Sequence, residues 1–95
     1  MIEFRQDSLD EVVAATEWYA QRSFRAAKNF NDRLDHVIAD VESDPERFPR
    51  IHLDFRFVRI SRFPYVVIFQ IRMNLVMVLA VAHSRRRDHY WLGRE

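Results

Sequence analysis

Cysteine is absent from this sequence of 95 residues, and glycine occurs only once, at position 93. Without cysteine the chain has no disulfide and no cysteine-ligated zinc site, and nothing indicates an oxidising compartment. A single glycine also excludes a Gly-rich phosphate-binding loop. The apolar runs are much shorter than the ~20 residues of a membrane-spanning helix, and the N-terminal MIEFRQDS lacks the features of a signal peptide. We therefore expect a cytoplasmic protein that does not bind a membrane.

Acidic residues are missing between Phe55 and Arg87, and the only lysine is Lys28. Residues 1–54 contain twelve acidic and seven basic side chains, whereas residues 55–95 contain two acidic and eight basic ones. This asymmetry indicates an acidic or polyanionic partner for the second half, unless the two halves neutralise each other in the fold. The four histidines have no ligand spacing, so we expect neither a metal ion nor another cofactor.

Two helices are predicted in the first half of the chain. Ser8 and Glu11 have the spacing of a capping box, and apolar residues at helical spacing follow, which predicts a helix over residues 9–21. Ser23 is a candidate cap for a longer helix over residues 24–43, and the proline that follows ends it. The short turn between the helices predicts an antiparallel hairpin with a shared apolar face.

Strands are predicted at both ends of the chain. Residues 2–6 are a candidate edge strand, and residues 46–54 have no clear period and are expected to form a loop. Three runs rich in β-branched and aromatic residues follow, at Phe55–Ile60, Tyr65–Ile71 and Leu75–Ala82. Met73-Asn74 is short enough for a hairpin turn, and the fully apolar last run suits a central strand covered on both faces.

The predicted fold class is α+β in one domain spanning residues 1–95. It comprises an N-terminal strand, an antiparallel two-helix hairpin and a three-stranded antiparallel meander. The helices are expected to pack on one face of the sheet.

Two segments of the second half resemble a known family. The first is RFVRISRFPYVVIF, residues 56–69, a basic strand followed by an aromatic-Pro-Tyr corner and an apolar strand. The second is VLAVAHSRR, residues 78–86, with Tyr90-Trp91 behind it. Together with the acidic helical hairpin in front, they resemble the ParE branch of the ParE/RelE toxins of bacterial toxin–antitoxin systems. The resemblance covers essentially the whole chain.

This resemblance implies a function and its partners. ParE-type toxins inhibit DNA gyrase, and a cognate antitoxin silences them by wrapping its C-terminal segment around the toxin. We therefore expect a plasmid-stabilising toxin that forms a hetero-oligomer with an antitoxin of the ribbon-helix-helix type and has no sequence-specific DNA binding. RelE-type relatives share the fold but cut messenger RNA on the ribosome. A ribosome-dependent endonuclease is one alternative, and a non-toxic module that only binds its antitoxin is another.

The endonuclease alternative requires an acid, a base and cations, but no metal. Residues of suitable type are Arg59, His83, Arg86 and Tyr90. Tyr90 could serve as an acid only if its pKa were strongly perturbed. No carboxylate occurs in the second half before Asp88 to orient His83, and lysines are scarce. We therefore favour a structural role for His83, in which the imidazole caps the strand end or bonds a loop carbonyl, and we favour a protein that is not an enzyme.

A docking surface is the interpretation that the arginines and aromatics favour, because basic side chains interleaved with aromatics fit an acidic peptide with apolar anchors or a nucleic acid. Tyr19 is expected in the core, whereas Trp18 should point about 100° away from it and be exposed. We expect one or two of Arg85, Arg86 and Arg87 to pair with the acidic first half, and the tail to pack partly on the sheet. The predicted partner-binding residues are Trp18, Arg56, Arg59, Arg62, Arg86, Tyr90 and Trp91.

Overall fold

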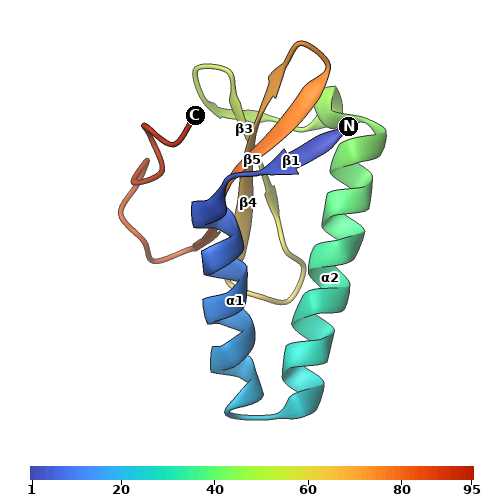
Figure 1. Ribbon diagram of the computed structural model, residues 1–95, viewed down its shortest axis with the longest axis vertical. Helices are drawn as coiled ribbons and strands as arrows, with labels where there is room; N and C mark the ends of the chain where they lie inside the picture. Colours follow the sequence, from blue (N-terminus) through green and yellow to red (C-terminus); the bar gives the residue numbers. More distant parts are fainter.

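A mixed sheet with a helical hairpin on one face makes up the protein, as shown in Figure 1 by a computed structural model that describes residues 1–95. The strands of the sheet lie in the order β1-β5-β4-β3-β2. β1 runs parallel to β5, and the other neighbouring pairs are antiparallel. In chain order, the elements are β1 (Ile2–Phe4), α1 (Gln6–Ala20), α2 (Phe24–Ser43), the 3-10 turn η1 (Pro45–Arg47), β2 (Arg50–His52), β3 (Phe55–Arg59), β4 (Tyr65–Arg72) and β5 (Leu75–His83). The predicted fold class is therefore confirmed.

The helical hairpin forms as its apolar pattern predicts. Ser23 caps α2, because its hydroxyl oxygen accepts a hydrogen bond from the Ala26 amide at 3.3 Å. The buried side chains of α2 lie three, four or seven residues apart and face α1 and the sheet. Tyr19 of α1 stacks on Phe30 of α2, with 5.4 Å between the ring centroids. The predicted core position of Tyr19 is confirmed.

The start of α1 differs from the prediction. The helix begins at Gln6, with Arg5 as its N-cap and no side-chain capping bond. Ser8 is a buried residue inside the first turn, and its hydroxyl donates to the Arg5 carbonyl at 2.7 Å. The capping box is therefore wrong. The Arg5 amide still donates to Val78 of β5, so strand pairing holds the chain until the helix begins. Glu11, which has no capping role, is free to point elsewhere.

The meander contains one strand more than predicted. Residues 50–52 of the predicted loop form β2, which pairs with β3 through Arg50 opposite Arg56 and His52 opposite Phe55. The register is irregular, and so short an edge strand has no hydrophobic period to reveal it. The predicted turn at Met73-Asn74 is confirmed, since both residues have the positive φ values of a two-residue hairpin loop.

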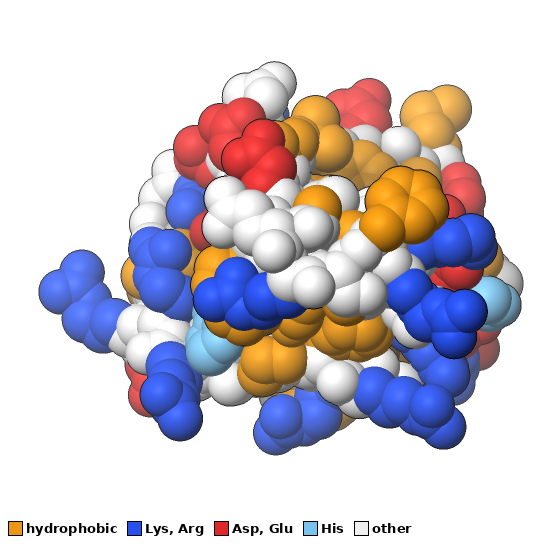
Figure 2. Space-filling view, turned by 90° about the horizontal axis from the view of Figure 1, so that it is seen from below, with side chains coloured by type: hydrophobic (Ala, Val, Ile, Leu, Met, Phe, Trp, Pro, Cys, Tyr) orange, Lys and Arg blue, Asp and Glu red, His pale blue; other side chains and the backbone are white.

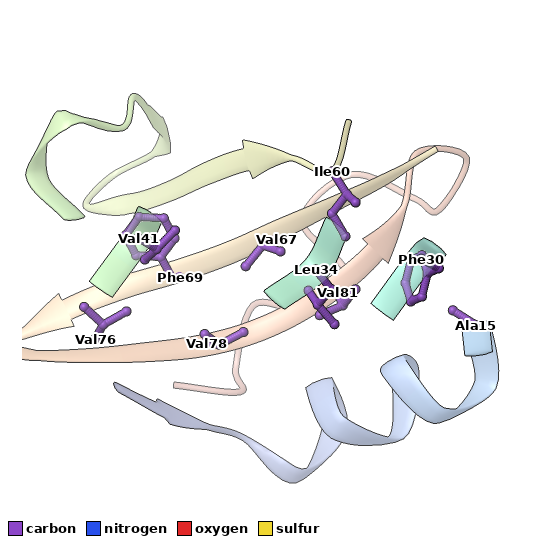
Figure 3. Packing of buried hydrophobic residues seen from close by; sticks show 10 residues of the cluster. All are labelled: Ala15, Phe30, Leu34, Val41, Ile60, Val67, Phe69, Val76, Val78 and Val81. Carbon is purple, nitrogen blue, oxygen red and sulfur yellow. The ribbon is translucent and has the colours of Figure 1, made fainter. Parts of the chain in front are cut away.

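β5 is the central strand of the sheet and is covered on both faces. One face packs against the helices through Val76, Val78 and Val81 (Figure 3). The register of β4 and β5 shifts between Ile68 and Phe69, and as a result the successive residues Leu79 and Ala80 both join the opposite core. That second core contains Phe55, Ile68, Met77, Leu79, Ala80, Ala82 and Trp91. The prediction of a doubly covered strand is confirmed, and the second cover is the C-terminal segment. Neither helix is long and apolar enough to cross a membrane.

Candidate functional site

Two hollows lie on either side of the C-terminal end of β5, and His83, Arg86 and Tyr90 line both of them. The first, which we call the helix-side cleft, has a volume of about 420 Å³. Its other lining residues are Glu11, Ala14, Ala15, Trp18, Tyr19, Pro64, Tyr65 and Val81. The second, which we call the sheet-side groove, has a volume of about 360 Å³. Its other lining residues are Ile51, Phe57, Arg59, Val66, Ile68, Ala82, Ser84, Arg87, Asp88, His89 and Trp91.

The two segments that suggested the family meet at this place. Tyr65, at the start of β4, lies opposite His83 at the end of β5. The Ser84 amide donates to the Pro64 carbonyl at 2.8 Å, which ties the aromatic-Pro-Tyr corner to the loop after β5. The Tyr65 and His83 rings pack edge to face, with centroids 5.1 Å apart. The sheet thus brings together residues that are about twenty positions apart in the sequence.

The imidazole of His83 is engaged by the loop that follows it. Its Nδ1 accepts a hydrogen bond from the Arg85 amide at 3.0 Å, and the His83 carbonyl accepts one from the Arg86 amide at 3.0 Å. A ring nitrogen that accepts a hydrogen bond carries no proton, so this geometry corresponds to the neutral ring protonated at Nε2. Of the two structural roles that we considered, the ring therefore caps the end of the strand by accepting from a backbone amide, and this nitrogen does not bond a loop carbonyl.

Glu11 is the residue of this site that sequence reasoning missed. Its Oε1 accepts a hydrogen bond from the Val81 amide at 3.0 Å, and its Oε2 accepts one from the Tyr90 hydroxyl at 2.5 Å. Arg94 donates to both carboxylate oxygens, at 3.0 and 3.3 Å. The apparent capping box hid this role, but a signal was present: Glu11 lies three positions after Ser8 and four before Ala15, on the buried face of α1.

The carboxylate of Glu11 changes the acidity of its neighbours. Burial raises the pKa of Tyr90, and the hydrogen bond to Glu11 and its charge raise it further. Burial also raises the pKa of Tyr65, with a further contribution from the Glu11 charge. Burial alone would lower the pKa of Arg94, but the hydrogen bond and charge of Glu11, together with the charges of Tyr90 and Asp7, outweigh it and leave the pKa raised. Tyr90 is therefore a weaker acid than a free tyrosine, the opposite of what general acid catalysis requires.

The predicted arginines fall into different environments. Arg56 donates to the carbonyls of Glu46 and Phe48 at 3.1 and 2.6 Å, and it thereby holds the segment before β2. Arg59 is exposed in the sheet-side groove, whereas Arg62 is exposed but lines neither hollow. The guanidinium carbon of Arg86 lies 3.9 Å from the centroid of the Tyr90 ring.

The expected pairing of the arginine run with the acidic first half is wrong. None of Arg85, Arg86 and Arg87 forms an ion pair, whereas Arg94 pairs with Asp7 at 3.5 Å and with Glu11 at 3.0 Å. Figure 2 shows Lys and Arg side chains spread around the lower half of one end of the molecule, with acidic side chains mostly above them. No group of three His, Asp or Glu side chains lies close enough to hold a metal ion.

The two tryptophans differ in exposure. Trp18 is 49% exposed at the helix-side cleft, and the guanidinium carbon of Arg22 lies 3.3 Å from its ring centroid. Trp91 is only 3% exposed and packs edge to face on Phe55, with 4.9 Å between centroids. The expected packing of the tail is therefore confirmed for Trp91. Its ring belongs to the core and offers little surface to a partner.

The family follows from the sequence as a whole. No curated protein matches the chain. The family model described as ParE toxin of type II toxin-antitoxin system, parDE, matches residues 2–88. This range includes every helix and strand and the arginine run, and it ends before Tyr90, Trp91 and Arg94. The chain belongs to the ParE family, the toxins of type II toxin–antitoxin systems.

Proposed function

We propose that this toxin acts by binding DNA gyrase and inhibiting it, without chemistry of its own, and that a cognate antitoxin neutralises it in the cytoplasm. The observation that carries the proposal is the family match over residues 2–88, because gyrase inhibition is the activity that the resemblance to ParE-type toxins implies. The antitoxin is expected to be a ribbon-helix-helix protein that forms a hetero-oligomer with the toxin.

The hydrogen bonds of the site support inhibition through contact over RNA cleavage. An endonuclease would need a base to remove the 2′-hydroxyl proton and an acid to protonate the leaving oxygen. His83 Nδ1 already accepts the Arg85 amide, and the Tyr90 hydroxyl already donates to Glu11. Burial and Glu11 also raise the pKa of Tyr90, which makes proton donation at neutral pH harder.

The surface chemistry supports an acidic partner with apolar anchors. Arg59, Arg86 and Arg87 stand in the sheet-side groove, whose lining includes the apolar side chains of Phe57 and Ile68. Only one acidic residue lines that groove, so its field favours carboxylates of a partner. The exposed Trp18 offers an aromatic anchor at the other hollow, and Arg62 adds a cation outside both. Our proposed partner-binding residues are Trp18, Arg59, Arg62, Arg86 and Tyr90, with Arg87 added from the groove. Arg56 holds the backbone before β2 and Trp91 is buried, so neither is included.

The test is a supercoiling assay with purified gyrase and the purified toxin. We expect inhibition that rises with toxin concentration and is reversed by the cognate antitoxin. The plasmid from cells that express the toxin should show altered supercoiling, and their transcripts should remain uncut. Gyrase that works normally at a large excess of folded toxin would overturn the proposal.

A ribosome-dependent endonuclease is the second candidate, and one observation favours it: Arg59, His83, Arg86 and Tyr90 all line the sheet-side groove. That reading predicts transcript cuts on translating ribosomes that disappear in the His83→Ala variant, a result that would refute gyrase inhibition as the main activity. A third candidate is a module that binds antitoxin without toxicity. It predicts normal growth of cells that accumulate the folded protein.

A further inference from the structure

The outer edge of β5 is completed by side chains. β1 pairs only with Val76, Met77 and Val78 of this strand. Beyond that point, Arg94 donates to the Leu79 carbonyl at 3.1 Å, and Glu11 accepts from the Val81 amide at 3.0 Å. An ion pair between these two side chains therefore takes the place of a neighbouring strand and satisfies edge groups that would otherwise need water or another partner.

The same ion pair holds the C-terminal tail. Glu11 and Arg94 have only 16% and 18% of their side-chain surfaces exposed, so water screens their attraction less than that of a surface pair. Arg94 is fixed further by Asp7, at 3.5 Å, and the Tyr90 hydroxyl donates to the second oxygen of Glu11. Acceptors on Asp7, Glu11 and Leu79 thus converge on Arg94, near the end of a tail that otherwise packs on the sheet through Trp91.

The tail in turn sets the shape of the candidate site. The Tyr90 ring lies 3.9 Å from the guanidinium carbon of Arg86 and 4.9 Å from that of Arg94. Both Arg86 and Tyr90 line the helix-side cleft and the sheet-side groove, so they form the wall between the two hollows. If Glu11 released Tyr90 and Arg94, nothing else in this network would fix the hydroxyl end of that wall.

We propose that Glu11 is a positioning residue of the toxin: through Tyr90 and Arg94 it fixes the C-terminal tail, and so holds Arg86 in the geometry that the target recognises. This inference rests on the proposed function, because the target is gyrase only if that proposal is right. It also extends beyond the family match, which ends before Tyr90 and Arg94. Arg86 and Tyr90 contact the target, whereas Glu11 acts through them.

The test compares five variants with the wild-type chain in the gyrase assay. Glu11→Ala and Arg94→Ala are each expected to weaken inhibition about tenfold, the change typical of a residue that matters at an interface. The double variant should be no weaker than either single variant, because both substitutions remove the same ion pair. Glu17→Ala is the matched control, since Glu17 is an exposed glutamate on the same helix that lines neither hollow. It should inhibit like the wild type.

Tail order is measured separately by hydrogen exchange. In Glu11→Ala, we expect faster exchange of the Val81 and Arg94 amides at unchanged helix content, whereas the Glu17→Ala rates should match the wild type. Glu11→Gln keeps an oxygen for the Val81 amide but loses the charge, so it provides a milder variant with intermediate inhibition. A merely structural Glu11 would lower the melting temperature and leave the inhibition by fully folded protein unchanged, which would overturn the inference.

These readouts separate the inference from the proposed function. A wild-type toxin that arrests growth without inhibiting gyrase would refute the proposed function alone, and the same variants would then be compared by growth arrest. Equal toxicity of Glu11→Ala and Glu17→Ala at equal amounts of folded protein would refute the positioning role alone. A wild-type chain without activity in either assay would overturn both.

Discussion

Trp91 provides a direct test of the docked tail. Its indole is 3% exposed and packs on Phe55 in the second core. An aromatic side chain buries roughly 150–250 Å², which at about 25 cal/mol/Å² corresponds to about 4–6 kcal/mol. Residual compactness of the unfolded chain reduces this figure by roughly 10–40%. Trp91→Ala is therefore expected to cost about 3–5 kcal/mol, the range seen for buried aromatics. That is a large share of the roughly 5–14 kcal/mol total expected for a domain of this length.

Thermal unfolding followed by circular dichroism measures this cost. A loss of about 3 kcal/mol should lower the melting temperature by at least about 12 °C in a domain of this size. Leu92→Ala is the neighbouring control, because Leu92 is 43% exposed and its replacement should change stability by about 0.5 kcal/mol or less. Removal of residues 88–95 should cost at least as much as Trp91→Ala, because it also takes Arg94 from Glu11. Equal melting temperatures for Trp91→Ala and Leu92→Ala would refute the docked tail.

Three smaller effects follow from single contacts. Arg56→Ala should lower the free energy of unfolding by about 1.5–3 kcal/mol in urea titrations, because Arg56 donates to two carbonyls. Arg59 is exposed, so Arg59→Ala is the control and should change the free energy of unfolding by no more than about 0.5 kcal/mol. Ser23→Ala should cost about 1 kcal/mol through loss of the α2 cap, and an unchanged urea midpoint would contradict that assignment. The pKa of Tyr90 is raised by burial and by Glu11, so folding favours the protonated hydroxyl. The contribution of Tyr90 to the free energy of unfolding is therefore full below about pH 10 and is lost as the pH rises further. When the pH is raised from about 9 to about 11, the free energy of unfolding of the Tyr90→Phe variant should therefore fall less than that of the wild type.

Periodic segments of the sequence were enough to predict most of the fold. The apolar face of α2 and the cap at Ser23 gave that helix its observed bounds, Phe24–Ser43. The apolar run of β5 predicted a strand covered on both faces, which the two cores confirm. Such patterns are local, because an apolar face must be buried whichever element packs against it. They can therefore be recognised without knowing which helices and strands are neighbours in the fold.

Non-local contacts account for what the sequence did not reveal. β2 is three residues long and exists only because β3 offers it a partner edge. Glu11 has the spacing of a capping residue, yet its partners are 70, 79 and 83 positions away in the chain. A local motif and a long-range ion pair compete for the same side chain here. Strand pairing of residues 2–4 decides the outcome, because it starts α1 before Ser8 can cap it.

The charge asymmetry of the sequence allowed two interpretations: the two halves neutralise each other, or the basic half binds an acidic partner. In the structure, each interpretation applies to different basic residues. Internal neutralisation accounts for Arg94, the only second-half base that pairs with acids of the first half. The three successive arginines after β5 have no acidic partner within the chain, and they are exposed around the end of the sheet. Like charges held together in this way destabilise the free protein slightly and are relieved when an acidic surface covers them. The ion pair of Glu11 and Arg94 therefore does more than neutralise charge, because it also anchors the tail. Arg85, Arg86 and Arg87 stay unpaired beside it, where an acidic partner could bind them.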